Sequence, residues 1–571
     1  MNDSPWLAQY PSSVPSEINP DRYDSLIDFF EDCVRKFNSA VAFENMGVDL
    51  TFDHLDELST AFANYLLNET DLQKGDRVAL QMPNILQYPV ALFGVLKAGM
   101  VVVNTNPLYK PSEMEHQFND AGAKGIVILN TMAFKLQEIL PHTPQLQTII
   151  IAEVGDLLGN LKGAIVDFMI KRVKRMVPDY DLPMAIDFNK AIHHGKKYTY
   201  QRPNLDRNDL AVLQYTGGTT GVAKGAALSH RNLIANVEQV NAWMKPRLIE
   251  GKEVTITALP LYHVFALTVN CLGMLGIGAK NILITDPRKM DDFCKVLKSH
   301  PFSVITGVNT LFNGLAQKEE FQKLDFSTLK IAVAGGMALQ KGVFDRWKAV
   351  TGNEIVEGYG LSETSPLLTC NPIDGSGRLG TIGLPVPSTE IRIMSEDGKI
   401  QAIGEFGEIW AKGPQVMTGY WQNREETDNV MENGWFKTGD IAFMDEDGFI
   451  KIVDRKKEMI NVSGMKVFPN EVENVISQIP GILEVGVIGV PHKTSGEVVK
   501  AFIVLTDKSI TEEEILKHCR DHLTAYKMPR FVEFRDDLPK SNVGKILRKE
   551  LRRENEAVAS KLKMQMKPTI H

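Results

Sequence analysis

The sequence predicts an α/β protein, with a large amino-terminal domain of parallel-sheet α/β subdomains and a small barrel-like β subdomain, followed by a small α+β carboxyl-terminal domain. The chain has 571 residues, too many for one hydrophobic core, so at least two domains are expected. Helical patterns alternate with runs of β-branched residues between about 50 and 350. Short strand patterns with turn signals replace them at 376–453, and a basic segment at 455–457 leads into a last mixed region.

The first region contains short apolar runs that are typical of buried strands, separated by helical stretches such as TFDHLDELSTAFANYLLN at 51–68. Alternation of this kind predicts parallel sheets covered by helices. The predicted strands are DRVALQMP (76–83), GIVIL (125–129), QTIIIAEV (147–154), EVTITALP (253–260), NILIT (281–285), FSVITGV (302–308) and LKIAVAGG (329–336).

The pattern changes near residue 376, where TEIRIMSEDGKI (389–400), GEIWAKGP (407–414) and DGFIKIVD (447–454) predict a small antiparallel or barrel-like unit. Beyond it, VGVIGVP (485–491), KAFIVLTD (500–507) and TEEEILKHCRDHL (511–523) mix short strands with a helix. We therefore expect a large domain over 1–454, with its α/β part ending near 375 and its β-rich part at 376–454. The small domain is expected over 455–571.

Composition favours a soluble globular protein and argues against several classes of protein. The net charge is −8, which argues against a nucleic-acid-binding protein. The five cysteines are widely scattered, so neither a disulfide framework nor a metal site is expected, and a reducing, cytoplasmic location fits. No signal peptide begins the sequence, and no uncharged apolar run is long enough to span a membrane.

The glycine-rich stretch YTGGTTGVAKG at 215–225 is a candidate phosphate-binding loop. It differs from the nucleoside-triphosphatase loop, because Ala223 and Gly225 flank its Lys224, and it lacks the dinucleotide-binding glycine spacing. An apolar strand pattern precedes it, and a helix capped by Ser229 is predicted to follow. Strand, glycine loop and helix together form a setting for binding anions through backbone amides. A polar turn without a ligand is the alternative.

The glycine-rich loop and five motifs after it, in order along the chain, resemble those of the adenylate-forming superfamily, which includes acyl-CoA synthetases, luciferases and peptide-synthetase adenylation domains. The five motifs are LPLYHVFAL (259–267), VAGGMAL (333–339), EGYGLSETSP (357–366), the stretch from Asn433 to Glu473, and PKSNVGKILRKEL (539–551). The stretch from Asn433 is similar to the signature of fatty acyl-CoA synthetases, and the long-chain bacterial branch is the nearest likeness. The resemblance covers nearly the whole chain.

The resemblance implies ATP-dependent ligation of a long-chain fatty acid to coenzyme A (CoA) through an acyl adenylate, with Mg²⁺ and release of AMP and diphosphate. The product would feed β-oxidation or lipid synthesis. Two alternatives stay open: a ligase for medium-chain or aromatic acids, and a non-catalytic lipid-binding protein on the same scaffold. Because dimers are common among the proteins that it resembles, a homodimer is a further expectation.

The resemblance implies roles for individual residues. Lys545 would place a cation beside the α-phosphate, Glu363 and Thr216 would bind Mg²⁺, and His263 would line the adenylate and acyl channel. The small domain would rotate about Lys457 between two half-reactions. The residues implied for nucleotide and CoA binding are Tyr215, Thr216, Gly217, Gly218, Thr219, Thr220, Gly221, Lys224, Gly335, Gly336, Glu357, Gly358, Tyr359, Gly360, Thr364, Asp440, Arg455, Lys457 and Gly464.

The stretch from Asn160 to Pro178 has a helical period with apolar residues broadly on one side and several basic residues. The apolar residues are Leu161, Ile165, Phe168, Met169, Val173 and Met176, and the basic ones Lys162, Lys171, Arg172, Lys174 and Arg175. A basic amphipathic helix is typical of binding to an anionic membrane surface, here the inner face of the cell membrane. A helix packed on the sheet with a solvated basic face is the alternative.

Overall fold

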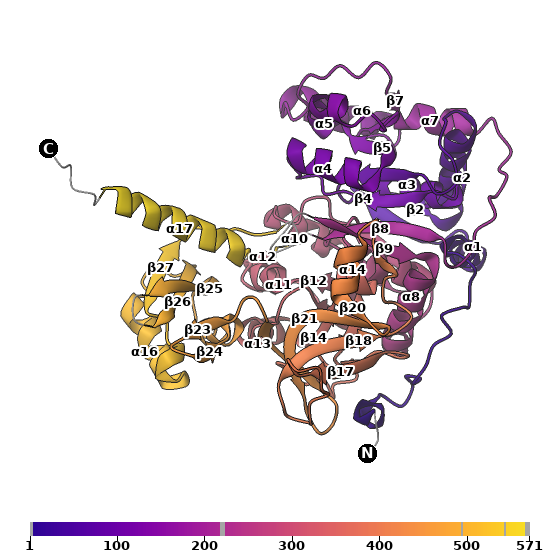
Figure 1. Ribbon diagram of the computed structural model, residues 1–571. Coiled ribbons are helices and arrows are strands. Elements are labelled where there is room, and N and C mark those ends of the chain that lie inside the picture. The colour runs from indigo at the N-terminus through magenta and orange to yellow at the C-terminus, as the bar shows by residue number, and fades with distance from the viewer. Residues whose placement is uncertain (1–3, 217–222, 493–494, 542–543, 566–571) are drawn as a thin grey trace.

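The computed structural model describes residues 4–216, 223–492, 495–541 and 544–565, with only the backbone of residues 558–565. A large body formed by about the first four fifths of the chain adjoins a smaller one formed by the last fifth (Figure 1). The predicted α/β class, with mixed sheets in a large domain and a smaller carboxyl-terminal domain, is confirmed.

One sheet of the large body is parallel through its centre and antiparallel at one edge. From β8 to β7 all neighbours are parallel, whereas β9 and β19 run antiparallel. In spatial order its described strands are β19 (Gly419–Tyr420), β9 (Lys224–Ser229), β8 (Leu210–Thr216), β4 (Val101–Asn104), β3 (Arg77–Gln81), β5 (Ala123–Leu129), β6 (Thr148–Ala152) and β7 (Ile186–Asp187).

The second sheet has the same character, with a parallel centre and antiparallel strands at both edges. Its described strands are, in spatial order, β16 (Leu384–Pro385), β15 (Leu367–Cys370), β14 (Ile355–Gly360), β13 (Ile331–Ala334), β12 (Val304–Gly307), β10 (Val254–Thr257), β11 (Lys280–Leu283), β1 (Val41–Asn45) and β2 (Val48–Thr51). The predicted buried strands at 76–154 and 253–336 therefore form parallel sheets.

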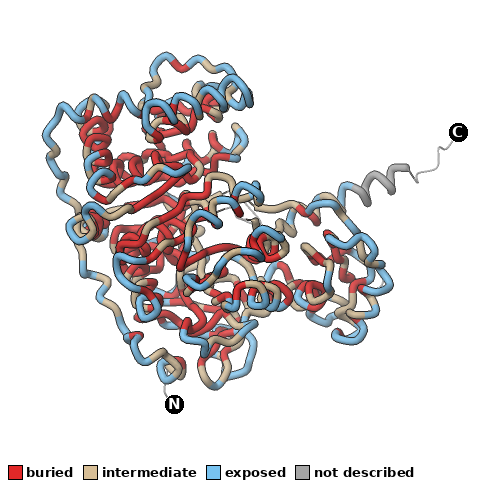
Figure 2. Tube along the Cα trace, turned by 180° about the vertical axis from the view of Figure 1, so that it is seen from behind, coloured by how far each residue is buried: buried red, intermediate tan, exposed pale blue. Residues whose placement is uncertain are grey.

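Helices cover these sheets, and the sheet strands and the inner helix faces are buried (Figure 2). Local sequence explains where several helices begin: the Thr51 side chain accepts a hydrogen bond from the backbone N–H of His54 at the start of α2. The helices are α1 (Leu26–Phe37), α2 (Phe52–Asn68), α3 (Gln87–Lys97), α4 (Pro111–Ala121), α5 (Ala133–Ile139), α7 (Phe188–Gly195), α8 (His230–Met244), α9 (Met274–Gly276), α10 (Met290–Ser299), α11 (Asn309–Ala316), α12 (Glu319–Gln322) and α13 (Lys341–Thr351).

The β-rich part of the large body is an antiparallel sheet, as predicted for 376–454. Its strands are β17 (Glu390–Met394), β18 (Gly407–Lys412), β21 (Trp435–Met444), β20 (Met431–Glu432) and β22 (Ile450–Arg455), with α14 (Arg424–Val430) beside them. Both β20 and β22 pair with β21, so the pairings among the described residues form an open sheet and do not close a ring.

The small body has its own hydrophobic core, whose clustered residues all lie between Ile460 and Leu551. The predicted boundary near residue 455 stays a prediction. Its elements are β23 (Ile460–Val462), β24 (Met465–Val467), α15 (Pro469–Ile476), β25 (Ile482–His492), β26 (Gly496–Leu505), α16 (Glu512–His522), β27 (Phe531–Arg535) and α17 (Arg548–Gln565).

The predicted order of strand, glycine loop and helix at 210–237 was wrong in one respect. The residues after the loop form β9, which pairs antiparallel with β8, so the loop joins two strands of a hairpin. The helix α8 begins only after β9, and its predicted cap is confirmed, because the Ser229 hydroxyl accepts a hydrogen bond from the backbone N–H of Asn232. The short apolar run AALS pairs with β8 as a strand, which its length and composition alone did not decide.

The predicted amphipathic helix consists of α6 (Asn160–Phe168) and a π-helical turn, η4 (Met169–Val173). Its apolar residues face solvent: the exposed fraction is 78% for Leu161, 59% for Phe168 and 57% for Val173. The opposite face touches the body of the protein, where Val166 and Ile170 pack against its hydrophobic core and Gly163 lies against the backbone of Gly155. The six apolar residues named above are therefore not the side of the helix that packs on the body.

All five cysteines are free and buried. Within residues 4–565, apart from the short gaps, no helix combines the length and the apolar character that crossing a bilayer requires.

Candidate active site

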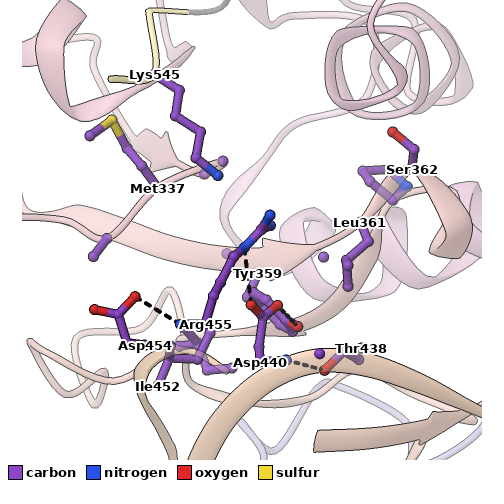
Figure 3. A pocket seen from close by; sticks show the side chains of 18 of the residues that line it. Met337, Tyr359, Leu361, Ser362, Thr438, Asp440, Ile452, Asp454, Arg455 and Lys545 are labelled. Atoms are coloured by element: carbon purple, nitrogen blue, oxygen red, sulfur yellow. Dashed lines mark hydrogen bonds and ion pairs between the residues drawn. The ribbon is translucent and has the colours of Figure 1, made fainter. Parts of the chain in front are cut away.

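A cavity of about 2030 Å³ lies where the two sheets of the large body, the β-rich sheet and the small body meet. Figure 3 shows Lys545, Arg455, Tyr359 and Asp440 gathered in it from separate elements. The predicted site residues that line it are Tyr215, Thr216, Lys224, His263, Gly335, Gly336, Glu357, Gly358, Tyr359, Gly360, Glu363, Asp440, Arg455, Lys457 and Lys545.

The parallel arrangement of β13 and β14 explains much of this gathering. Carboxyl ends of parallel strands lie at the same edge of a sheet, so the segments that follow them become neighbours. Gly335 and Gly336 follow β13, and Glu363 lies just after β14. Gly335 cannot carry a larger side chain without rearrangement, since a Cβ there would lie 2.8 Å from the Phe265 ring.

A second pair of strands brings Asp440 and Arg455 together. They are opposite residues of β21 and β22, and 3.2 Å separates Arg455 Nε from Asp440 Oδ1. The Tyr359 hydroxyl donates a hydrogen bond of 2.7 Å to Asp440 Oδ2. Burial, together with the neighbouring Asp440 carboxylate, raises the pKa of Tyr359, so its hydroxyl keeps its proton. An ionised carboxylate with both oxygens facing polar partners is suited to bind a pair of hydroxyl groups.

Lys545 enters the cavity from the small body on a tight turn. Gly544 before it has φ +80°, and a Cβ there would lie 2.8 Å from Thr310 Oγ1, so this position requires glycine. The Thr310 hydroxyl donates a hydrogen bond of 3.1 Å to the Gly544 carbonyl and thereby joins this turn to α11 of the large body. Burial lowers the pKa of Lys545 to about 7, and the Arg455 guanidinium adds to this shift.

Glu363 is buried, and its Oε1 accepts a hydrogen bond of 2.7 Å from the Tyr420 hydroxyl. Thr216, at the end of β8, lines the same cavity. Lys224 forms an ion pair with Glu426, and its ammonium lies 5.3 Å from the centre of the Tyr420 ring. The lysine of the glycine-rich loop is thus held beside Glu363, at the end of the cavity where hydroxyl and carboxylate oxygens collect.

Two titratable groups line the cavity on the side of β14 and of the segment after β10, the buried Glu357 and the partly buried His263. Burial lowers the pKa of His263 to about 4, with a further contribution from the Lys545 cation, so its imidazole is neutral at physiological pH. Burial raises the pKa of Glu357 to about 8, although the backbone N–H of Leu339 donates a hydrogen bond to its carboxyl group. Both groups are therefore uncharged in the closed site near neutral pH.

Some of the predicted site residues do not line the cavity. The Thr364 hydroxyl is fully buried and bonds to backbone groups of Leu361 and Pro366. Gly464 lies in the exposed turn between β23 and β24, with φ +86°. Gly217, Gly218, Thr219, Thr220 and Gly221 lie outside the described residues.

Sequence reasoning missed several residues that shape the site, among them Tyr420, Glu426, Asp454 and Arg548. Tyr420 and Glu426 lie in a stretch without any recognised motif, and only the pairing of β19 with β9 brings them to the loop. Arg548 lies within the basic run KILRKELRR, where nothing local distinguishes a buried arginine from its exposed neighbours. Asp454 directly precedes Arg455, and this adjacency was the one available signal.

Two family models match the chain over most of its length. The AMP-binding enzyme model matches residues 30–421, and the model of the AMP-binding enzyme C-terminal domain matches residues 471–545. The boundary between the two matches falls in the same region as the boundary between the two bodies.

Curated relatives match nearly the entire chain. A long-chain-fatty-acid–CoA ligase of Escherichia coli O6:H1 is 56% identical over 549 residues, which cover 96% of this chain and 98% of the relative. A ligase of the same name from Yersinia pestis is 54% identical, with 97% and 99% covered. Among solved structures, an anthranilate CoA ligase in complex with anthranoyl-AMP has a TM-score of 0.84 at 25% identity, covering 96% of this chain and 99% of that one.

Proposed function

Because the chain belongs to the AMP-binding enzyme family, we propose that it ligates a long-chain fatty acid to CoA through an acyl adenylate, with release of AMP and diphosphate. One observation carries this proposal: relatives more than half identical over almost the whole chain are long-chain-fatty-acid–CoA ligases. The geometry agrees, since a lysine from the small body enters a cavity lined by the family's nucleotide-binding motifs.

In the first half-reaction the fatty acid carboxylate attacks the α-phosphorus of ATP, the bond to the bridging oxygen breaks, and diphosphate leaves. The carboxylate and the phosphates are all anions, so positive charge beside the α-phosphate stabilises the transition state. Lys545 and Arg455 are the cations that face this part of the cavity. Asp440 is positioned to bind the ribose hydroxyls, displacing the contacts it now makes with Tyr359 and Arg455.

A magnesium ion fits the end of the cavity where Glu363 and Thr216 provide hard oxygen ligands. When bound, the ion would neutralise charge on the phosphates. In the described part of the chain no cluster of three or more His, Cys, Asp or Glu side chains could hold a metal ion. The triphosphate and water would therefore supply most of the remaining ligands.

In the second half-reaction the CoA thiolate attacks the acyl carbon, and AMP leaves with its phosphate oxygen. Lys545 occupies the approach that the thiol needs, so we propose that residues 455–571 rotate about Lys457 as one domain. The separate core of this region supports such a rotation. Gly464, now exposed in a turn, would then pass beside the pantetheine arm.

The test is diphosphate release by the purified protein with a series of acids from acetate to stearate, and with anthranilate and coumarate, each with and without CoA. We expect the highest kcat/KM for long-chain acids, and CoA thioesters only when CoA is present. A preference for an aromatic acid would instead support the aromatic-acid alternative, which the anthranilate ligase structure keeps open. Absence of diphosphate release with every acid would overturn the proposal.

We also propose that α6 and η4 bind an anionic membrane surface, where long-chain substrates reside. Five apolar side chains of α6 and η4 are exposed, as are Met176 just beyond them and the basic residues Arg172, Lys174 and Arg175. Lys171 differs, because it pairs with Glu153 and fastens the segment to the body. A helix with this composition lies in the membrane interface with its apolar face buried among the lipids.

Flotation with vesicles of phosphatidylglycerol and phosphatidylcholine tests this surface. Changing Arg172, Lys174 and Arg175 to Glu, or Leu161 and Phe168 to Ser, should each abolish flotation while leaving diphosphate release from a soluble medium-chain acid unchanged. Wild-type levels of flotation in both variants would exclude this segment as the membrane site. Binding of this kind would place the protein peripherally on the inner face of the membrane. Analytical ultracentrifugation would test separately whether the protein is a homodimer, as the family resemblance implies.

A further inference from the structure

A buried ion-pair cluster outside the catalytic contacts joins the small domain to the last residues of the large one. Asp454 lies in β22, opposite Ile441 of β21, and is therefore part of the large domain. Its side chain is 1% exposed. Arg548, at the start of α17 in the small domain, approaches it with 3.2 Å between Nη1 and Asp454 Oδ1, and the backbone N–H of Asn470 donates to Asp454 Oδ2 at 3.0 Å.

The position of Arg548 within the small domain does not depend on Asp454. Glu473 accepts hydrogen bonds from Arg548 Nε at 3.0 Å and from Nη2 at 2.8 Å. The Glu473 carboxylate in turn accepts a hydrogen bond of 2.8 Å from the backbone N–H of Val487 in β25. Arg548 and Glu473 thus move together with the small domain, whereas Asp454 stays with the large one.

The contact between Arg548 and Asp454 therefore crosses the hinge at Lys457. Arg548 follows Lys545 by three residues, and Asp454 directly precedes Arg455, which contacts Asp440. The same closure that brings the Lys545 ammonium into the cavity brings the Arg548 guanidinium to the Asp454 carboxylate. A rotation of the small domain would separate this pair and remove from Asp454 both the Arg548 cation and the Asn470 hydrogen bond.

We propose that the Asp454–Arg548 pair is a latch that holds the small domain in the adenylation arrangement and thereby positions Lys545. The latch must open before CoA can attack the acyl adenylate. Asp454 and Arg548 are positioning residues here, since neither needs to touch the substrate. The inference rests on the proposed function, because a latch has a kinetic meaning only if two half-reactions use different domain arrangements.

A matched control is present one helical turn further along α17. Arg552 forms an ion pair with Glu458, a carboxylate that is also buried. Both partners lie on the small-domain side of Lys457, so this pair does not cross the hinge. Loss of the Arg552 charge should therefore affect the small domain without favouring either arrangement.

The experiment measures both half-reactions for Asp454→Asn and Arg552→Gln. Adenylation is followed by fatty-acid-dependent exchange of labelled diphosphate into ATP, and thioester formation by release of AMP from synthetic acyl adenylate and CoA. Asp454→Asn should lower the exchange rate by about tenfold or more, because the closed arrangement becomes less populated, and leave thioester formation equal or faster. Arg552→Gln should change the two rates by the same factor.

Equal losses in the two half-reactions for Asp454→Asn, or no loss in either, would overturn the latch. Asp454→Ser, which keeps an acceptor for the Asn470 N–H in a smaller side chain, carries the same test if the Asn variant does not fold. Absence of exchange in the wild-type protein would instead refute the proposed function, so the two failures are distinguishable.

Discussion

Replacing Lys545 with Ala is the sharpest test of the site, because the structure predicts how the effect of the substitution depends on pH. Removing one group that stabilises developing charge costs about 10²–10³ in rate, or about 2.7–4 kcal/mol. With a pKa of about 7, the Lys545 side chain carries its proton below pH 7 and loses it as the pH rises. About nine-tenths of it is charged at pH 6 and about one-tenth at pH 8. The ratio of wild-type to variant kcat/KM should therefore fall about tenfold between these values.

The assay is fatty-acid-dependent exchange of diphosphate into ATP at limiting ATP, so that kcat/KM reports the free enzyme. Changes in the ionisation of ATP cancel in the ratio, since both proteins receive the same substrate. Lys545→Arg is the control: its guanidinium stays charged, so its own ratio to the Ala variant should not change with pH. Thioester formation from supplied acyl adenylate should be nearly the same in all three proteins. A pH-independent wild-type ratio, or an equal loss in both half-reactions, would refute the role given to Lys545.

Two further predictions concern residues that support the site. Tyr420→Phe removes the hydrogen bond to Glu363 and should raise the Mg²⁺ concentration needed for half-maximal adenylation by about tenfold. A magnesium titration measures this concentration, and an unchanged value would contradict the role of Glu363 as a metal ligand. Gly360→Ala would put a Cβ 1.8 Å from the Pro366 carbonyl oxygen and should lower the free energy of unfolding by about 3 kcal/mol or more in urea denaturation. Gly352→Ala, at φ +72° with open space around it, should cost only about 1 kcal/mol, and equal costs would contradict the steric argument.

The parallel sheets could be predicted because a strand buried on both faces is a short continuous run of apolar and β-branched residues. Runs of this kind formed β3, β5, β6, β10, β11, β12 and β13. The segment after the glycine-rich loop contains no β-branched residue, and its sequence AALS is compatible with a strand or with the start of a helix. Its pairing with β8, which decided the matter, depends on residues on the far side of the loop.

The amphipathic stretch at 160–176 shows the same limit in another form. Its period identified which apolar residues fall broadly on one side, and the structure exposes all six of them. Which face would turn outward could not be predicted, because it depends on the close contact of Gly163 with Gly155 and on the ion pair of Lys171 with Glu153. The apolar face is the exposed one, and this is the observation on which the membrane proposal depends.

By itself, the sequence determined the α/β class, the order of the motifs and the chemical type of each candidate site residue, because periodicity and motif spacing are properties of neighbouring positions. The tertiary structure alone decided which charges meet. Tyr420 and Glu363 are 57 positions apart in the chain, and Arg548 and Asp454 are 94 apart. A hydrogen bond or ion pair acts over a few ångströms of space and does not depend on how far apart its partners are along the chain. Its partners therefore become known only when the fold brings them into contact.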